Sequence, residues 1–437
     1  MVSILLVAFF LRMGMLWINA KRHPSFFQIS TELVQKEMKS SEPPYVNSYG
    51  NEISNVAYSL VCKKQGLASP FGGSTGPTGW VAPGLVLIYA LSFYLFGCFS
   101  LGSLIFMLAL SILLSLIMVF LIYLTSLQLF NSRSTAYLCS FLFAVCPQDV
   151  WLFSKNFQQD FNLYTFLFVL IFFLFLRFIK SRATKNLILF SLVAAIALHF
   201  TPVLAIPIAV CITLFVLKDK TDKTYALKQA ILCCIIIFMI ITPYIIYQKY
   251  RLGSWTFIKS NAVYEINLGN TRGYAGVLVL DLFRKKHPAA NRFEFQSYKT
   301  MGEVNYVRSK LTEFLDNFNL LRFIKLTIKR FFCFYLIYVP YVSDLKFTVS
   351  LFLKYVGYSI SGLSMILYLF LRFRNMDWFD ALIYFYILAY SVPYVFGGIM
   401  YRYSFPICTL TTILLGKSLW LLFGSKDLKE GIPNQRT

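Results

Sequence analysis

Long hydrophobic stretches alternate with polar connections along almost the whole chain. An α-helix needs about 20 predominantly apolar residues to cross a hydrocarbon core of about 30 Å, and several stretches reach or approach that length. The pattern predicts an all-α polytopic membrane protein with about ten transmembrane helices. These helices are expected at residues 2–19, 101–127, 134–148, 161–178, 187–199, 203–217, 229–247, 347–371, 379–398 and 403–423.

Basic residues gather in three short connections between the predicted helices. Residues 177–185 hold four of them, residues 218–228 hold another four, and residues 372–374 hold two. Loops rich in Lys and Arg stay on the cytoplasmic side of most membrane proteins, so these connections and both chain ends are predicted to lie inside. The alternation then places two long segments, residues 20–100 and 248–346, together on the outward side.

Shorter apolar helices are expected within these two outward segments. Residues 83–97 are apolar but end at a glycine, which favours a juxtamembrane helix in the membrane interface, with a true span as the alternative. Apolar residues recur at three- and four-residue steps from Val304 to Ile324, with charged residues between them, and predict an amphipathic helix on the bilayer. The run at residues 331–342 contains Pro340 and is short for a span, so an interfacial position is favoured there too.

The composition agrees with a membrane protein and excludes several other classes. Hydrophobic residues make up 58% of the 437-residue chain and charged residues 14%, and the mean hydropathy is +0.64. Soluble enzymes, transcription factors and secreted disulfide scaffolds do not have this composition. The net charge of +22 is explained by the positive-inside bias and by anionic lipid, so we expect a bilayer and no nucleic acid as partner.

The cysteines and the first apolar stretch carry two further expectations. Eight of the nine cysteines lie in or beside apolar stretches and only Cys62 lies in a clearly polar loop, so no disulfide or metal framework is expected. Residues 2–19 lack a basic n-region and a clean cleavage site, and are therefore predicted to be a first membrane helix. Within that helix, Arg12 either snorkels to the interface or faces the helix bundle.

A motif rich in glycine and proline follows an acidic residue in the first outward segment. Glu52 opens a helix, residues 69–78 read Ser-Pro-Phe-Gly-Gly-Ser-Thr-Gly-Pro-Thr, and the next apolar segment ends in Phe96-Gly97. The motif is not a P-loop, because it lacks the Gly-Lys-Ser/Thr ending. In this order of features the sequence resembles polyprenyl-phosphate-dependent glycosyltransferases of the GT-C superfamily, in the branch of protein O-mannosyltransferases and the lipid A aminoarabinose transferase. It looks most similar to bacterial family 39-like proteins.

Three further places extend the resemblance over nearly the whole chain. Asp160 stands where the family carries its second acidic residue, and residues 287–306 look like the large-loop signature of the same bacterial group. Residues 402–407 are similar to the family's Arg-Tyr-Arg-Phe-Pro-Ile motif, but the second Arg is Ser404 here. This departure puts a two-arginine phosphate clamp in doubt.

The resemblance also implies a division of the chain. Residues 1–247 would form an N-terminal transmembrane GT-C-like module that includes the outward loop 20–100. Residues 248–346 would form a second periplasmic loop region, and residues 347–437 the C-terminal transmembrane helices with a short cytoplasmic tail.

Sugar transfer from a polyprenyl phosphate needs a base for the acceptor hydroxyl and cationic groups for the departing phosphate. Glu52 is the candidate base, and its alternative is an ordinary acid at a helix N-terminus. Asp160 is expected to orient the acceptor or to share the base role, with the same alternative. Arg402 is the candidate phosphate ligand, unless it is only an interfacial anchor. Lys354 is a further candidate for phosphate, with snorkelling as its alternative.

The resemblance implies a multi-pass glycosyltransferase of the bacterial inner membrane whose active site faces the periplasm. Its donor would be an undecaprenyl-phosphate-linked sugar, its acceptor a lipid, a glycan or a protein, and direct displacement would invert the anomeric centre. No cofactor or metal is expected, because the branch is mostly metal-independent. The rival functions are a lipid-linked oligosaccharide flippase or transporter, which would usually hold ionisable residues at mid-membrane, and a non-catalytic membrane assembly partner.

Overall fold

The computed structural model describes residues 1–22, 51–147, 149–150, 161–219, 222–271, 280–336 and 349–424. Over these residues the chain is built of helices joined by turns and loops, which confirms the all-α prediction. The α-helices are α1 (Val2–Arg22), α3 (Asn51–Val61), α4 (Pro83–Phe96), α5 (Leu101–Phe130), α6 (Arg133–Ala144), α8 (Phe161–Ser181), α9 (Thr184–Phe200), α10 (Ala205–Lys218), α11 (Lys223–Leu252), α12 (Ala262–Gly269), α13 (Leu280–Lys286), α14 (Arg292–Met301), α15 (Glu303–Asp316), α16 (Leu320–Tyr335), α17 (Val349–Arg372), α18 (Trp378–Phe396) and α19 (Phe405–Phe423).

Five of the described helices are long and apolar enough to cross a membrane. They cover Leu101–Phe130, Asn162–Ser181, Lys223–Leu252, Trp378–Phe396 and Arg402–Phe423. Several other predicted spans are shorter apolar helices, Val2–Ile18, Thr184–Phe200 and Pro202–Lys218, and the one expected at residues 134–148 ends at Ala144. The structure therefore confirms a multi-pass helical protein, but it does not confirm ten spans.

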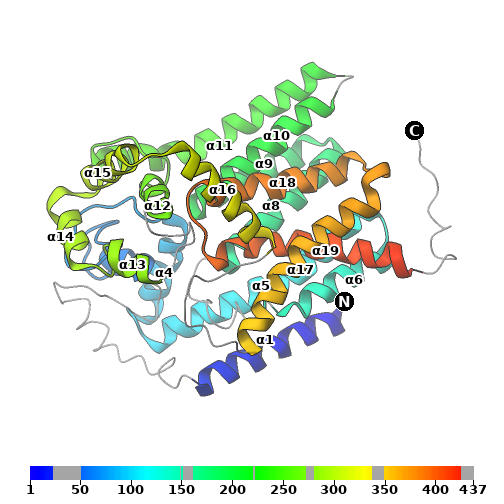
Figure 1. Ribbon diagram of the computed structural model, residues 1–437, viewed down its shortest axis with the longest axis horizontal. Helices are drawn as coiled ribbons and strands as arrows, with labels where there is room; N and C mark the ends of the chain where they lie inside the picture. The colour runs from blue at the N-terminus through cyan, green and yellow to red at the C-terminus, as the bar shows by residue number, and fades with distance from the viewer. Residues whose placement is uncertain are drawn as a thin grey trace.

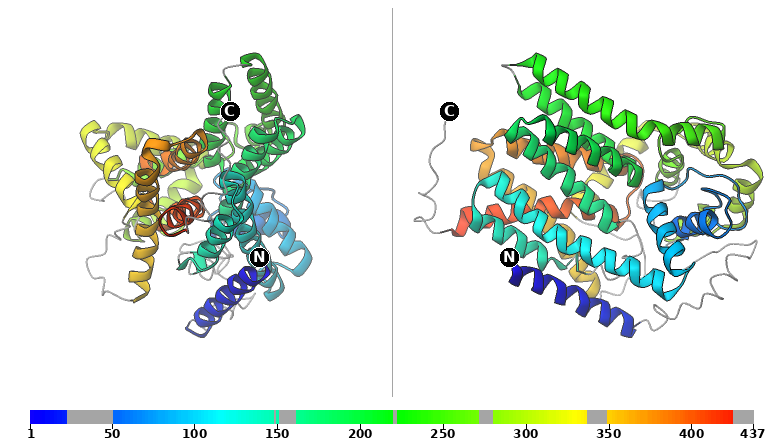
Figure 2. Two further views of the ribbon diagram at one scale, coloured as in Figure 1. Left: turned by 90° about the vertical axis from the view of Figure 1, so that its right-hand side faces the viewer. Right: turned by 180° about the vertical axis from the view of Figure 1, so that it is seen from behind.

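The long helices form a bundle, and the short helices gather at one of its ends (Figure 1). We call α3, the loop of residues 62–82 and α12 to α15 the cap. The view from behind shows the cap at the end of the bundle that lies away from the C-terminal end of α19 (Figure 2). The cap combines the two segments that the sequence places on one side of the membrane.

Aromatic side chains form the centre of both parts. In the bundle, the ring centroid of Tyr386 on α18 lies 4.7 Å from Phe168 and 4.9 Å from Phe172 on α8. In the cap, the ring centroid of Trp80 lies 4.8 Å from Tyr264 and 5.7 Å from Tyr298. The rings in the cap come from both outward segments, so the two segments share one buried core.

The amphipathic helix predicted from residue 304 to 324 is two helices in the structure. The chain leaves the helix at Asn317, and the side chain of Asn319 accepts a hydrogen bond from the backbone N–H of Arg322 to begin α16. Asparagine is a strong N-cap, so the apolar periodicity continues across a real helix boundary. The run from residue 331 ends α16 at Tyr335, and its remainder from residue 337 to 342 lies outside the described residues.

Arg12 faces the bundle, which decides between the two expectations for this residue. Its guanidinium is fully buried and pairs with the carboxylate of Asp149, which is also fully buried. It also donates to Ser115 Oγ on α5 and, at 3.1 Å, to the carbonyl oxygen of Ala144. A buried charge requires such partners, and Arg12 thus joins α1 to α5 and to the end of α6.

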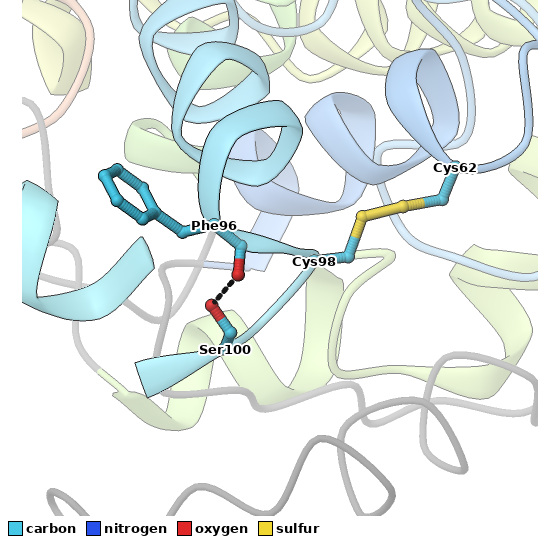
Figure 3. The surroundings of a disulfide bond; sticks show 4 residues. All are labelled: Cys62, Phe96, Cys98 and Ser100. Carbon is cyan, nitrogen blue, oxygen red and sulfur yellow. Dashed lines mark hydrogen bonds between the residues drawn. A yellow bond between two sulfur atoms is a disulfide. The ribbon is translucent and has the colours of Figure 1, made fainter. Parts of the chain in front are cut away.

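A disulfide joins Cys62, after the end of α3, to Cys98, between α4 and α5 (Figure 3). The expectation of no disulfide was therefore wrong. Cys98 was grouped with the apolar stretches, but it lies in the short break between two helices, where the Ser100 hydroxyl donates to the carbonyl oxygen of Phe96 at 2.6 Å. The sequence separation of 36 residues hides the proximity that the packing of α3 against α4 creates.

We predict that Arg12→Met lowers the free energy of unfolding by about 3 to 5 kcal/mol, because it leaves the Asp149 carboxylate buried without its cation. The double variant Arg12→Met/Asp149→Leu should recover most of that loss, since it removes both charges. Thermal unfolding of the purified proteins in one detergent measures both effects. Equal losses in the single and double variants would contradict this account of the pair.

Candidate active site

A cavity of about 690 Å³ lies where the cap meets the bundle. One wall is apolar and comes from the connection between α9 and α10, with Phe200, Pro202, Val203 and Ile206. The other walls carry polar side chains from α3, from α12 and from the turn before α19. Ligand sites commonly have this mixture of apolar lining and a few placed polar groups.

Glu52 lies at the first turn of α3 and contributes its carboxylate to the cavity. Its Oε1 is 3.2 Å from Nε2 of His287, which follows α13 in the second outward segment. The Nδ1 of His287 accepts a hydrogen bond from the backbone N–H of Ala289 at 3.1 Å. Nδ1 therefore carries no proton in this arrangement, and Nε2–H donates to the carboxylate of Glu52.

Burial keeps His287 in its neutral form. Its side chain is only 5% exposed, its ring stacks on Phe283 with centroids 4.1 Å apart, and burial lowers its pKa to about 3. Glu52 is 26% exposed toward the cavity. A neutral imidazole orients the carboxylate by a hydrogen bond without neutralising its charge, so Glu52 remains able to accept a proton.

The glycine- and proline-rich motif positions this pair through Glu303 at the start of α15. The buried carboxylate of Glu303 accepts hydrogen bonds from Thr78 Oγ1, from the backbone N–H of Gly79 at 2.7 Å and from Ser260 Oγ at 2.7 Å. It also accepts one from the hydroxyl of Tyr298 at 2.6 Å. Thr78 and Gly79 therefore connect the two outward segments through Glu303, and none of residues 69–80 lines the cavity.

Glu294 on α14 has a similar positioning role. Its carboxylate accepts a hydrogen bond from the hydroxyl of Tyr306 at 2.8 Å and lies 2.9 Å from Nζ of Lys310. These contacts join α14 to α15 beneath the aromatic core of the cap. The large-loop signature of residues 287–306 is thus divided between one residue at the cavity, His287, and several that hold the cap together.

Arg402 lies in the short 3₁₀ turn of residues 401–404 and lines the same cavity as Glu52. Two further charged residues line it from the second outward segment, Lys259 before α12 and Glu265 on α12. Burial raises the pKa of Glu265, and the charges of Lys259 and Arg402 both oppose that rise. The cavity thus holds a carboxylate paired with a neutral imidazole, and separately two cations with a second carboxylate.

The structure brings together two of the four site residues predicted from sequence. Glu52 and Arg402 share the cavity. Asp160 lies outside the described residues, directly before the start of α8. Lys354 belongs to α17, but its side chain also falls outside the description. In the described part of the chain, no group of three or more His, Cys, Asp or Glu side chains is arranged to hold a metal ion.

Three polar residues of the cavity, His287, Lys259 and Glu265, received no role from the sequence. His287 was part of a quoted signature but received no role, and its contact with Glu52 spans 235 positions of sequence, 287 minus 52. Lys259 and Glu265 carry no motif. The available signal for Lys259 was only its place in an outward segment, which other lysines of the chain share.

Similarity to known proteins is found in part of the sequence and in the fold. Residues 81–247 match the family model described as dolichyl-phosphate-mannose-protein mannosyltransferase. No curated protein matches the chain. The apo oligosaccharyltransferase of Archaeoglobus fulgidus shares the fold, with a TM-score of 0.51 and 13% identity over 94% of this chain and 50% of that chain.

The oligosaccharyltransferase AglB from Archaeoglobus fulgidus has been solved in complex with an inhibitory peptide and a dolichol-phosphate. That structure has a TM-score of 0.47 and 11% identity over 96% of this chain and 53% of that chain. The chain therefore spans about half the length of the solved structures it matches. The family match and the fold confirm the predicted resemblance to GT-C glycosyltransferases.

We predict that His287 makes the folded protein sensitive to acid. Its pKa is about 3 in the folded protein and ordinarily 6.5, so between about pH 7 and pH 5 only the unfolded chain takes up this proton. Stability should therefore fall by about 2 kcal/mol over that interval. In His287→Gln, which keeps a donor for Glu52, this part of the loss should disappear. Thermal unfolding of both proteins at the two pH values measures it, and equal pH dependence would contradict the assignment.

Proposed function

We propose that the protein is a membrane glycosyltransferase that transfers a sugar from a polyprenyl-phosphate-linked donor to an acceptor at the outward face of the membrane. The observation that carries this proposal is the shared cavity of Glu52 and Arg402. A base and a cation in one cavity are the two groups that the reaction requires. The match of residues 81–247 to a family named for a lipid-phosphate sugar donor supports the donor class.

Glu52 is the general base in this mechanism. Nε2–H of His287 holds its Oε1, and we assign Oε2 to removal of the proton from the acceptor hydroxyl. The acceptor oxygen attacks the anomeric carbon as the bond from that carbon to the phosphate oxygen breaks. The electron pair stays on the phosphate, and this direct displacement inverts the anomeric configuration.

The apolar wall of the cavity suits the lipid part of the donor. Phe200, Pro202, Val203 and Ile206 line this side, next to helices that are apolar enough to lie in a bilayer. A polyprenyl chain can leave the cavity along such a surface without exposing its methylene and methyl groups to water. Arg402, at the polar side, is then placed to hold the phosphate.

Two observations support an outward-facing cavity. The Cys62–Cys98 disulfide belongs to the cap region, and stable disulfides form mainly on the oxidising side of a membrane. The basic connections meet at another part of the bundle, where Arg182 pairs with Asp219 and Nζ of Lys218 lies 4.2 Å from the ring centroid of Trp378. We therefore assign the cap to the periplasmic side of a bacterial inner membrane.

The remaining finer assignments belong to the same proposal. Asp160 is assigned to acceptor orientation, since Tyr164 of the following helix lines the cavity. Lys354 remains the reserve phosphate ligand, and the donor lipid is undecaprenyl phosphate. The acceptor is a lipid, a glycan or a protein. A flippase would move the lipid-linked sugar without cleaving it, and a non-catalytic partner would bind it without turnover.

We predict that Glu52→Gln reduces sugar transfer by at least the order of 10²-fold, because the amide keeps the shape of the side chain but does not accept a proton. Binding of the lipid phosphate should remain within a few-fold of wild type. The measurement uses purified protein with undecaprenyl-phosphate sugars and envelope extracts as acceptor source, followed by mass spectrometry. The exposed Asp316→Asn is the matched control for loss of one negative charge. Near-normal transfer by well-folded Glu52→Gln would remove Glu52 from the mechanism.

We predict that a cysteine placed at the exposed Gln296 in the cap reacts with a membrane-impermeant maleimide in intact cells with a permeabilised outer membrane. A cysteine at the exposed Lys223, in a basic connection, should react only after the inner membrane is opened. Labelling is read as the increase over the wild-type protein, which corrects for its native thiols. The reverse pattern would place the cavity in the cytoplasm and would contradict the proposed donor side.

A further inference from the structure

The cavity holds two cations that approach one carboxylate from different segments of the chain. Lys259 comes from the segment before α12, Glu265 from α12 itself and Arg402 from the turn before α19. Asn261 Nδ2 donates to Oε1 of Glu265 at 3.3 Å. The sequence predicts one phosphate ligand at this cavity, Arg402, and Ser404 stands in place of the second arginine of the family motif.

The backbone on both sides of Lys259 is held firmly. The carbonyl oxygen of Ile258 accepts a hydrogen bond from Gln248 Nε2 at 2.6 Å, and the N–H of Ser260 donates to the carbonyl oxygen of Gly79 at 2.9 Å. Ile258 itself has a φ of +50°, which a β-branched residue rarely adopts. Such strain persists where the surroundings impose it, and here it sets the direction of Lys259.

The segment that carries Glu265 is fixed to the segment that leads to Arg402. Arg330 is fully buried on α16 and donates to the carbonyl oxygens of Gly269 at 2.6 Å and of Phe396 at 3.0 Å. A Cβ on Gly269 would lie 1.8 Å from the carbonyl oxygen of Gly397. The end of α12 and the end of α18 are therefore in direct backbone contact, which fixes the backbone that carries Glu265 against the backbone that leads to Arg402.

We infer that Lys259 and Arg402 together form the phosphate site, and that Glu265 is an internal counter-ion whose place the phosphate takes. This inference rests on the proposed function and assigns residues to the same site. In the free protein, Glu265 offsets part of the positive charge that the two cations bring into a partly buried cavity. When a phosphate binds, its oxygens take over that interaction.

The charges of donor and product explain why a counter-ion is useful. A sugar linked through a phosphodiester carries one negative charge, whereas the phosphate monoester left after transfer carries about 1.5 to 2 at neutral pH. Two cations alone would hold that product more tightly than the donor. The ionised Glu265 repels the additional charge and so favours release of the lipid phosphate after the sugar has left.

Other ionisable groups near Glu265 have separate partners or lie on a different wall. Glu52 and His287 are paired with each other, with Glu52 Oε1 3.2 Å from His287 Nε2. On α14 and α15, which cover α12, Glu294 is paired with Lys310 and Glu303 is bound by Tyr298 and its other donors.

Tyr264, next to Glu265, is buried with its pKa well above the ordinary range. Lys259 and Arg402 are thus the charges that act most directly on Glu265.

The test is a titration of the purified full chain in lipid nanodiscs with undecaprenyl monophosphate. Lys259→Met and Arg402→Ala should each weaken binding by roughly 10- to 100-fold, the scale of one charge-assisted contact. Glu265→Gln should strengthen it by about 10-fold. Lys299→Met and Asp316→Asn, exposed changes of the same charge outside the cavity, should leave binding unchanged. Lys259→Arg should restore most of the affinity, which separates lost charge from lost folding.

A second readout isolates the counter-ion. Affinity is measured at about pH 8 and at about pH 5.5. Because burial raises the pKa of Glu265, its carboxylate takes up a proton at a higher pH than an ordinary glutamate, so its negative charge in the wild-type protein should be smaller at the lower pH. The ligand for this readout is an undecaprenyl-phosphate sugar, whose phosphodiester carries one negative charge at both pH values. The affinity ratio between Glu265→Gln and wild type should then fall toward one at the lower pH. A constant ratio, or equal affinity of the two proteins at both pH values, would overturn the counter-ion role.

The two levels of proposal fail in different ways. If Lys259→Met binds undecaprenyl monophosphate as tightly as the wild-type protein while Arg402→Ala binds it more weakly, the two-cation site is overturned. The glycosyltransferase proposal is not affected by that result. Binding that follows the expected order, in a protein that transfers no sugar from any undecaprenyl-phosphate donor, would support the two-cation site and overturn the transferase. Wild-type protein that binds no undecaprenyl monophosphate would overturn both.

Discussion

The arrangement of the site depends on the burial of one carboxylate, that of Glu303. An ionised carboxylate inside a protein is stable only when donors surround it, and Glu303 satisfies this requirement with Thr78, Gly79, Ser260 and Tyr298. These donors belong to both outward segments. The need to satisfy one charge therefore brings together parts of the chain more than two hundred residues apart, and Glu52 and His287 meet as a consequence.

The membrane sets a second constraint on the same region. Backbone polar groups need internal partners within a bilayer, so the helices of the bundle are long and regular. Irregular chain such as the loop of residues 62–82 is stable only where it packs against protein or water, which is its position in the cap. The cavity lies where the cap meets the helix bundle, with apolar and polar walls. A lipid tail and a polar headgroup require a boundary of this kind.

Much of the fold follows from local pattern, and this is what the sequence predicts well. Apolar length identifies α5, α8, α11, α18 and α19 as helices able to span a membrane. Glu52 and Arg402 needed more than local pattern, because the family resemblance of the motifs around them singled them out. The Cys62–Cys98 disulfide and the His287 contact depend on how α3 packs against distant elements. Periodicity carries no information on such pairings. The helix boundary at Asn319 was not predicted for a different reason. The apolar periodicity continues through this position, while the side chain of Asn319 caps a new helix there.

The two ends of the cavity are electrostatically different, and the proposed chemistry needs that difference. A general base must keep its negative charge, and no cation may neutralise that charge. A neutral His287 next to Glu52 meets this condition, whereas a cationic side chain at the same place would not. A leaving phosphate needs cations, but a lysine or arginine close to Glu52 would lower the basicity of its carboxylate. Lys259 and Arg402 instead lie with Glu265 on the walls formed by α12 and the turn before α19. In the proposed site, Glu265 offsets part of their field in the free protein and the bound phosphate does so in its place, so the two cations lower the basicity of Glu52 less than they would alone.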